Sequence, residues 1–307
     1  MHVVTIGNFD GVHEGHRALI SRARDLAEKG SGLARVTAVT FEPLPAEILA
    51  PERAPARLQS LASRSACLKA MGVEEVIELP TTRELLGTDP EDFIEEILER
   101  LSGKSAVGAF VEGPDFRFGK ARSGSVDTLQ EHGRRAGFEV DIVPEVSVRL
   151  NDGLLVEARS STIRRLLCLG RVEDAARMLG RPFEVSGTVV IGDQRGRELG
   201  YPTANLDLGE LILPGDGVYA ARAILPDGQR LPAAASIGSK PTFEATPRVL
   251  EAHILDWQGE IDDYGWVMNL QLIRRLRGQE QYDGVEPLLK QMARDCAQVL
   301  SEVEIDG

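Results

Sequence analysis

Two of the five histidines lie close together and are the first candidates for chemistry. His13 and His16 stand three residues apart in the stretch GNFDGVHEGH, in which Gly7, Gly11 and Gly15 let the backbone turn sharply or approach a ligand closely. A helix that begins at about His16 would aim its free N–H groups at the same point, which favours an anion. Two imidazoles beside a phosphate would donate hydrogen bonds and offset charge gathering on a phosphoryl group. The pattern predicts a phosphate site, with half of a metal site and an ordinary strand-to-helix turn as open alternatives.

A second group of phosphate-binding side chains occurs in ARSSTIRR, residues 158–165. Ser160, Ser161 and Thr162 offer hydroxyls just before a helical stretch that carries Arg164 and Arg165. Hydroxyls, helix-end amides and arginines commonly hold phosphate oxygens. The simpler interpretation is a capped helix with a basic first turn.

Oxygen ligands for a hard cation occur in GTVVIGDQRGRELGYPTANLDL, residues 187–208. Thr203 and Asn205 are two residues apart, so in an extended segment their side chains share one face. Mg²⁺ accepts such ligands when a substrate phosphate supplies the charge. The alternative is a turn in which Thr and Asn bond the backbone.

A carboxylate that could act as a general base follows in VLEAHIL, a stretch that reads as an amphipathic strand. Glu251 in this strand would accept a proton from a hydroxyl within hydrogen-bond reach. The alternative is a solvated glutamate on the outward face.

The elements that position these residues fall into two regions of the chain with different sequence patterns. Up to about residue 145, short β-rich runs alternate with helix-like segments, which is typical of a doubly wound parallel sheet with helices on both faces. The predicted strands are 3–6, 36–41, 73–79, 106–111 and 139–143, and the predicted helices are 17–29, 60–71, 89–101 and 124–136. Such sheets bind ligands at the carboxyl ends of their strands, where residues 5–19 would lie.

The second region follows the helical stretch 160–183 and consists of short predicted strands separated by Gly, Pro and Asp. Strands with turn signals and no intervening helices predict a small antiparallel barrel. Apolar residues at three- and four-residue spacing between Val285 and Leu300 predict one closing helix. We place the domain boundary so that the domains are 1–182 and 183–307.

Composition limits the class of protein. Hydrophobic residues make up 42% and charged residues 27% of the 307, as in ordinary globular proteins. The net charge of −13 disfavours stable nucleic-acid binding. No stretch resembles a membrane span or a secretion signal, so we expect a cytoplasmic protein that binds no membrane. Cys67, Cys168 and Cys296 are expected to be reduced thiols.

The motifs together resemble a known family. GNFDGVHEGH with SSTIR resembles the H-x-G-H nucleotidyltransferase superfamily, and the run TIGNFDGVHEGHRALI, TFEPLP, GPDFRFGKARSG, RSSTIRRLL is similar to the adenylylating module of prokaryotic bifunctional riboflavin kinase/FAD synthetases. The resemblance continues through GDQRGRELGYPTAN, SIGSKPTF and LEAHILDW, and so covers nearly the whole chain. It implies an N-terminal Rossmann-like domain that transfers AMP from ATP to FMN and releases pyrophosphate, and a C-terminal barrel that phosphorylates riboflavin.

The resemblance also implies roles for individual residues, with Mg²⁺ as cofactor and ATP as co-substrate. The reactants and products would be riboflavin, FMN, FAD, ATP, ADP and pyrophosphate; the oligomeric state is left open. Glu251, His13 and His16 would be catalytic, and Thr203 and Asn205 would hold Mg²⁺. ATP would be bound by Gly7, Asn8, Phe9, His13, His16, Ser160, Arg164, Thr203 and Asn205, and the flavin by Asp115, Gly192, Arg197, Gly200, Tyr201 and Arg274.

Two positions depart from the family pattern. Leu44 stands where the run F-D-P-H-P has a histidine, and Ser125 stands where an acidic residue often follows R-x-G. These departures motivate an alternative, a riboflavin kinase whose adenylyl transfer is impaired or altered. A further alternative is a non-catalytic flavin sensor or carrier built on the same two domains. The presence of His13, His16, Thr203, Asn205 and Glu251 argues against it.

Overall fold

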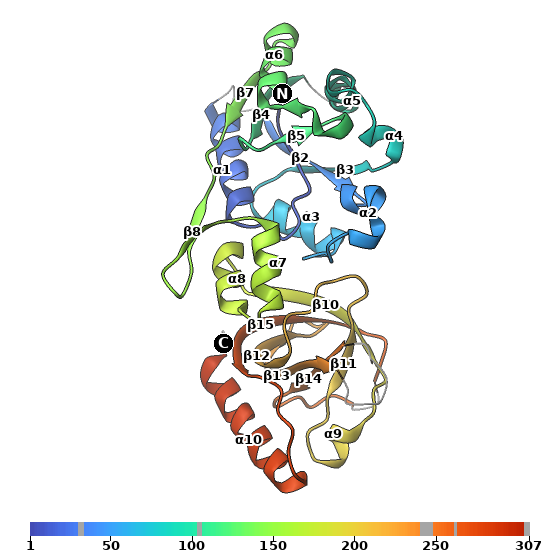
Figure 1. Ribbon diagram of the computed structural model, residues 1–307, viewed down its shortest axis with the longest axis vertical. Helices are drawn as coiled ribbons and strands as arrows, with labels where there is room; N and C mark the ends of the chain where they lie inside the picture. Colours follow the sequence, from blue (N-terminus) through green and yellow to red (C-terminus); the bar gives the residue numbers. More distant parts are fainter. Residues whose placement is uncertain (30–33, 103–105, 240–247, 261–262, 304–307) are drawn as a thin grey trace. The chain divides into compact units, whose positions relative to one another are not determined.

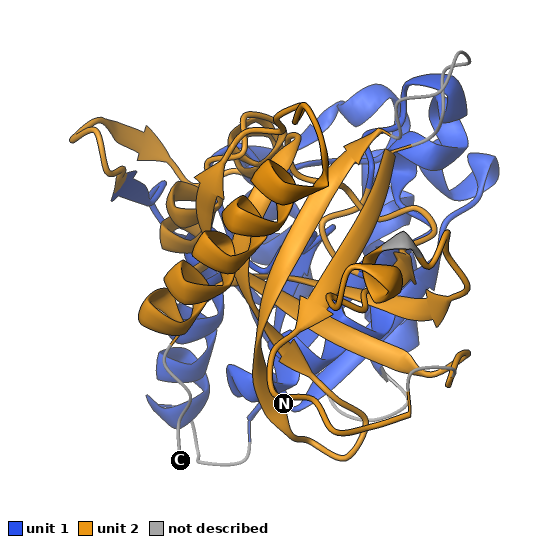
Figure 2. Ribbon diagram, turned by 90° about the horizontal axis from the view of Figure 1, so that it is seen from below, with its two compact units in different colours: residues 1–56, 60–148 blue, residues 57–59, 149–307 orange. Residues whose placement is uncertain are grey.

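The computed structural model describes residues 1–29, 34–102, 106–239, 248–260 and 263–303. The chain folds into two compact units (Figures 1 and 2): unit 1 comprises residues 1–56 and 60–148, and unit 2 comprises 57–59 and 149–307. Of the predicted motif SIGSKPTF, residues 240–243 lie outside the described residues. Each unit is described by itself below.

Unit 1 is built on a five-stranded parallel sheet in the order β3-β2-β1-β4-β7. The strands are β1 (His2–Gly7), β2 (Arg35–Glu42), β3 (Glu75–Pro80), β4 (Val107–Glu112) and β7 (Glu139–Ile142). The order reverses beside β1, because β2 and β3 extend the sheet in one direction and β4 and β7 in the other. The carboxyl ends of β1 and β4 therefore flank the topological switch point, the place where such sheets bind ligands.

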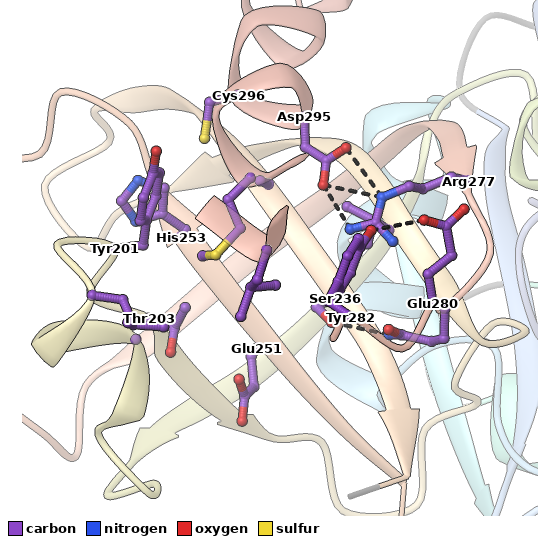
Figure 3. Close-up of a pocket in the computed structure, with 17 residues that line it drawn as sticks. Tyr201, Thr203, Ser236, Glu251, His253, Arg277, Glu280, Tyr282, Asp295 and Cys296 are labelled. Atoms are coloured by element: carbon purple, nitrogen blue, oxygen red, sulfur yellow. Dashed lines mark hydrogen bonds and ion pairs between the residues drawn. The ribbon is translucent and has the colours of Figure 1, made fainter. Parts of the chain in front are cut away.

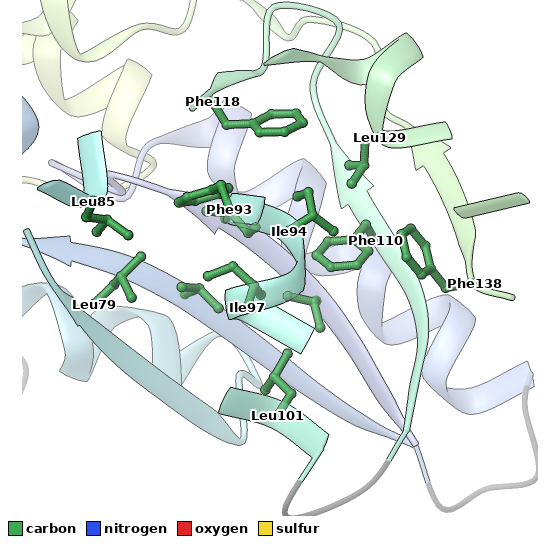
Figure 4. Close-up of a cluster of buried hydrophobic side chains, with 13 residues drawn as sticks. Leu79, Leu85, Phe93, Ile94, Ile97, Leu101, Phe110, Phe118, Leu129 and Phe138 are labelled. Carbon is green, nitrogen blue, oxygen red and sulfur yellow. The ribbon is translucent and has the colours of Figure 1, made fainter. Parts of the chain in front are cut away.

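Helices cover both faces of this sheet, as predicted. The long helices are α1 (Glu14–Lys29), α3 (Leu61–Ala70), α5 (Pro90–Ser102) and α6 (Val126–Ala136). Side chains alternate along β1, so Val4 belongs to the buried cluster on one face, in which Figure 4 labels Ile94 and Leu129, while Val3 belongs to the cluster with Ile20 and Leu68 on the other. Both clusters are buried, which explains why the strands read as nearly continuous apolar runs.

Shorter elements connect this framework. They are α2 (Pro45–Leu49), η1 (Pro51–Arg53), α4 (Arg83–Leu86), β5 (Arg117–Phe118), η2 (Lys120–Arg122) and β6 (Gly124–Ser125). Helix α1 begins at Glu14, two residues before the start expected at about His16 and three before the predicted range 17–29. An acidic residue in the first turn is favoured by the helix dipole, and Glu14 occupies this position.

Unit 2 contains the predicted antiparallel barrel, closed in the order β10-β11-β14-β13-β12-β15. Its strands are β10 (Phe183–Val190), β11 (Ala204–Asp207), β12 (Gly217–Ile224), β13 (Arg230–Ser239), β14 (Arg248–Ile254) and β15 (Val267–Arg277). A short helix, α9 (Arg195–Glu198), lies in the connection between β10 and β11, and the predicted closing helix is α10 (Val285–Glu302). Buried alanines at 221, 233 and 252 leave room for the larger side chains inside this small barrel.

A hairpin, whose first strand contains the last two residues of unit 1, and two helices of unit 2 precede the barrel. The hairpin strands are β8 (Ser147–Arg149) and β9 (Leu155–Glu157), and the helices are α7 (Ser160–Cys168) and α8 (Val172–Leu179). Helix α8 packs against β10 and β15. Arg171 joins this helix pair to the hairpin, since it donates hydrogen bonds to both Asp152 and Asp174.

Candidate functional sites

The turn between β1 and α1 has an unusual backbone. Phe9 and Val12 have positive φ values of 47° and 39°, a region in which the Cβ of an L-residue crowds the backbone and β-branched residues are rare. Their side chains are fully buried, so core packing holds the conformation. A strained backbone of this kind persists only where the surrounding packing holds it in place, and such places are commonly ligand sites.

A buried arginine anchors the same turn. Arg64 of α3 is only 2% exposed and donates from Nη1 to the carbonyl oxygen of Asn8 over 2.8 Å. Its Nη2 forms an ion pair with Glu42 at the end of β2, with an N···O distance of 2.6 Å. Our sequence analysis missed Arg64, because an arginine in a polar helical stretch carries no signal that it is buried.

The two histidines of the turn lie against each other. Their ring centroids are 3.7 Å apart with an interplanar angle of 20°, and the His13 backbone N–H donates to His16 Nδ1 over 3.2 Å. An accepting Nδ1 carries no proton, so the neutral His16 ring has its proton on Nε2. His13 is 7% exposed and His16 is half-buried, which places both between the core and the surface at the switch point.

Glu112 connects the ends of the two strands that flank this point. The last paired residues of β1 and β4 are Val4 and Phe110. Two residues further along both strands, the Glu112 Oε1 accepts a hydrogen bond from the Ile6 N–H over 2.7 Å. The side chain is 1% exposed. Burial raises the pKa of the Glu112 carboxyl well above its ordinary value, and the hydrogen bond from Ile6 only partly opposes this. Our sequence analysis missed Glu112 as well.

The other residues predicted for adenylyl transfer fall in several places. Gly7 ends β1, and a Cβ there would lie 3.3 Å from the buried Phe9 ring. Asp115 is exposed in the loop after β4, at the same edge of the sheet as the histidine turn. Ser160 and Arg164 belong to α7 in unit 2, and their contact with ATP stays a prediction.

The two departures from the family pattern have structural roles. Leu44 is 5% exposed at the start of α2, where its N–H donates to Glu47 Oε2 over 3.0 Å. Ser125 is the N-cap of α6, and its Oγ accepts from the Thr128 N–H over 3.4 Å. Ser125 thus gives this helix the kind of side-chain cap that serine commonly supplies. Within the described ranges, no group of three or more His, Cys, Asp and Glu side chains is arranged to hold a metal ion.

In unit 2, the strand register aligns three polar residues on neighbouring strands. Asn205 of β11 lies directly opposite Glu251 of β14, which in turn lies opposite Ser236 of β13. Directly opposite side chains in antiparallel strands point to the same face, with Cβ atoms about 5 Å apart. The barrel therefore places an amide, a carboxylate and a hydroxyl in one row.

A pocket of about 250 Å³ lies between the barrel and α10, and Glu251 and Ser236 of this row line it (Figure 3). Figure 3 shows the Glu251 side chain between Thr203 and Ser236. The residues that line the pocket include Leu199, Tyr201, Thr203, Ser236, Glu251, His253, Arg277, Tyr282, Met292 and Asp295. The structure thus brings Tyr201, Thr203 and Glu251, which were predicted separately, to one cavity.

Gly192 leaves space for the Asn205 side chain. A Cβ on Gly192 would lie 2.1 Å from Asn205 Nδ2 and 2.5 Å from Oδ1, so any larger residue here would displace the amide from its present position. Thr203 and Asn205 supply a hydroxyl and an amide oxygen, the hard donors that Mg²⁺ prefers. The residues present therefore fit a magnesium ion that also binds a substrate phosphate.

The far wall of the pocket is a charged cluster centred on Arg277. This arginine of β15 makes a bidentate contact to Asp295 of α10, with N···O distances of 3.1 Å from Nε to Oδ1 and 2.8 Å from Nη2 to Oδ2. Asp295 is 3% exposed and accepts a further hydrogen bond from Gln291 over 2.9 Å. The Tyr282 hydroxyl donates to Glu280 over 2.8 Å. These contacts hold α10 against the barrel and keep the cavity walls in place.

The remaining predicted flavin-binding residues do not line the cavity. Arg274 forms ion pairs with Glu302 at 2.9 Å and Glu173 at 3.5 Å, and it is absent from the residues around the pocket. Arg197 and Gly200 are exposed in and after α9, and Gly200 has a φ of 82°. A flavin-binding role for these three residues stays a prediction.

Comparison with known proteins assigns each half of the chain to a family. The FAD synthetase family model matches residues 1–152, and the riboflavin kinase family model matches residues 179–302. In the described part of the chain, no helix is long and apolar enough to span a membrane.

Similar proteins match along the whole chain. The bifunctional riboflavin kinase/FMN adenylyltransferase of Escherichia coli (strain K12) is 35% identical, over 95% of this chain and 90% of that protein. The Pseudomonas fluorescens protein of the same name is 37% identical, over 96% and 91%. A crystal structure titled macrolide-efflux protein, from Streptococcus pneumoniae, superposes with a TM-score of 0.84 at 30% identity, over 99% of this chain and 95% of that one. The chain belongs to the family of bifunctional riboflavin kinase/FMN adenylyltransferases.

Proposed function

We propose that Glu251 is the general base with which unit 2 phosphorylates riboflavin, and that His13 and His16 serve the transfer of AMP to FMN in unit 1. The row of Asn205, Glu251 and Ser236, of which Glu251 and Ser236 line the pocket, carries the proposal for unit 2. The assignment of the two activities to residues 1–182 and 183–307 is supported by the family models over 1–152 and 179–302.

In the kinase step, the 5′-hydroxyl of the ribityl chain attacks the γ-phosphorus of ATP. The Glu251 carboxylate accepts the hydroxyl proton, the new O–P bond forms, and the bond to the β–γ bridging oxygen breaks so that ADP leaves. Thr203 and Asn205 would hold Mg²⁺, which when bound neutralises charge on the ATP phosphates. Positioning of the hydroxyl between Glu251 and the phosphate supplies much of the acceleration.

In the adenylyl step, a phosphate oxygen of FMN attacks the α-phosphorus of ATP and pyrophosphate leaves. The His16 Nε2–H and the N–H groups at the start of α1 donate to phosphate oxygens on which negative charge increases. His13 stacks on His16 and fixes the orientation of its ring. Ser160 and Arg164 would bind the triphosphate, and Asp115 would lie near the flavin. We place both steps in the cytoplasm, where ATP is available.

A time course separates this proposal from its nearest alternative. The protein is incubated with riboflavin, ATP and Mg²⁺, and flavins are separated by chromatography. FMN should rise first and FAD should follow. A reaction that stopped at FMN would identify a riboflavin kinase with an impaired second step, and binding of flavin with no ATP turnover would identify a sensor.

A further inference from the structure

His253 is a pocket residue that the proposed mechanism does not use. It lies two positions after Glu251 on β14, so the period of the strand puts both side chains on one face, and both line the pocket. Its Nδ1 is 2.8 Å from the carbonyl oxygen of Pro202. A carbonyl oxygen only accepts, so Nδ1 carries the proton and donates it to this contact.

The contact between His253 and Pro202 extends the pairing of β11 with β14 beyond the last backbone pair. Strands β11 and β14 pair through Leu206–Leu250, Asn205–Glu251 and Ala204–Ala252. One step further along this register, Thr203 would oppose His253, but β11 begins only at Ala204. The His253 side chain reaches the preceding carbonyl instead and so ties the segment before β11 to β14.

A ring contact supports the same segment. The Tyr201 and His253 rings meet edge to face, with centroids 5.2 Å apart and an interplanar angle of 65°. Tyr201 is in turn held by its backbone N–H, which donates to the Gly196 carbonyl over 2.8 Å. Residues 201 and 202, which lead directly into Thr203, are therefore attached to the strand that carries Glu251.

We infer that His253 is a positioning residue for riboflavin phosphorylation, which sets Thr203 in place relative to Glu251 through the Pro202 carbonyl. This inference rests on the proposed roles of Thr203 and Glu251. It gives His253 no contact with the reacting atoms. Loss of the Nδ1 hydrogen bond should loosen the proposed magnesium ligand while the base keeps its place.

Two variants distinguish the role of Nδ1 from that of Nε2 in the His253 ring. Asparagine presents an N–H near the position of Nδ1, whereas glutamine presents one near the position of Nε2. His253→Asn should retain the contact to Pro202, and His253→Gln and His253→Leu should lose it. In both deficient variants we expect the Mg²⁺ concentration for half-maximal FMN formation to rise about tenfold, the upper value of one such hydrogen bond, with a smaller change in kcat at saturating Mg²⁺.

A binding measurement gives a second readout. Calorimetric titration with Mg²⁺ and ADP is compared between the parent protein and Asn205→Ala, and the heat lost in Asn205→Ala is assigned to unit 2. His253→Leu should weaken this same component about tenfold, and His253→Asn should restore it. FAD formation from supplied FMN serves as the control for unit 1, and the thermal transition of unit 2 reports whether each variant is folded.

Restoration by Gln rather than Asn would overturn the inference, because it would show that Nε2 contacts a substrate. Equal activity and equal Mg²⁺ dependence in His253→Leu would overturn it too. The test is independent of the proposed base: if Glu251→Gln kept full kinase activity, the proposed function would fail, whereas the Mg²⁺ dependence of the His253 variants would still report on the Pro202 contact.

Discussion

Asn205 and Glu251 lie directly opposite each other across strands β11 and β14. The pairing puts a neutral amide and a carboxylate on one face of the barrel, beside the pocket that Glu251 lines. The separation of the proposed metal ligand from the proposed base is therefore set by strand register. The predictions for unit 2 follow from this pair.

Replacement of Glu251 by glutamine removes the proton acceptor and keeps the shape of the side chain. We expect FMN formation from riboflavin to fall by about 10² to 10⁴, the usual contribution of a general base. FAD formation from supplied FMN should stay unchanged, because the histidines proposed for that step lie in unit 1. Initial rates of both reactions on one preparation check this, with the exposed Glu286 changed to Gln as control.

Substitution of Gly192 by alanine should displace the Asn205 amide. The new Cβ would lie 2.1 Å from Nδ2, and the side chain is the part that can move. We expect the KM for MgATP in riboflavin phosphorylation to rise about tenfold or more, as for loss of a ligand worth about 1.4 kcal/mol. Gly278→Ala is the matched control, since its Cβ would meet only Arg275 at 3.8 Å. An unchanged KM in Gly192→Ala would argue against Asn205 as a ligand.

Removal of the His13 ring should lower FAD formation and spare FMN formation, the reverse of the effect expected for Glu251→Gln. His13→Ala takes away the ring that stacks on His16 at 3.7 Å, so the His16 donor loses its orientation. We expect FAD formation to fall by about 10² to 10³, as when one preorganised donor is lost, while FMN formation is retained. Loss of both activities in a folded variant would contradict the modular assignment.

The buried carboxyl of Glu112 should make unit 1 less stable as the pH rises. Its pKa in the folded protein lies well above the ordinary 4.5. Below pH 4.5 both folded and unfolded chains hold the proton. Above it the unfolded chain releases the proton first, so stability declines until the pH passes the folded-state pKa. Each unit of pKa elevation corresponds to about 1.4 kcal/mol.

Glu112→Gln keeps an oxygen that can accept from Ile6 and abolishes the titration. The variant should therefore unfold at a higher temperature than the parent at pH 8, with a difference that shrinks toward pH 4. Thermal unfolding of unit 1 followed between pH 4 and 8 measures this, with the exposed Glu52 changed to Gln as control. A constant difference across this range would show that Glu112 does not titrate there.

Much of this molecule follows from local sequence patterns. Alternation of apolar runs with helical segments indicates the sheet of unit 1, and turn residues between short strands indicate the barrel, because these signals have the period of the elements themselves. The H-x-x-H spacing and the Thr203–Asn205 pair likewise mark candidate sites, since residues two or three apart in sequence stay close together in space.

Tertiary structure decided the contacts between residues that are far apart in sequence. Arg64 reaches Asn8 across 56 positions, and Glu112 reaches Ile6 across 106. Neither has a local signature, because a charged side chain in a helix or at a strand end is usually solvated. The register of β11 on β14 is also non-local, and a slip of one residue would turn Glu251 to the opposite face. The sequence alone determined which residues could do chemistry, whereas the closed barrel and the strand order determined which of them meet.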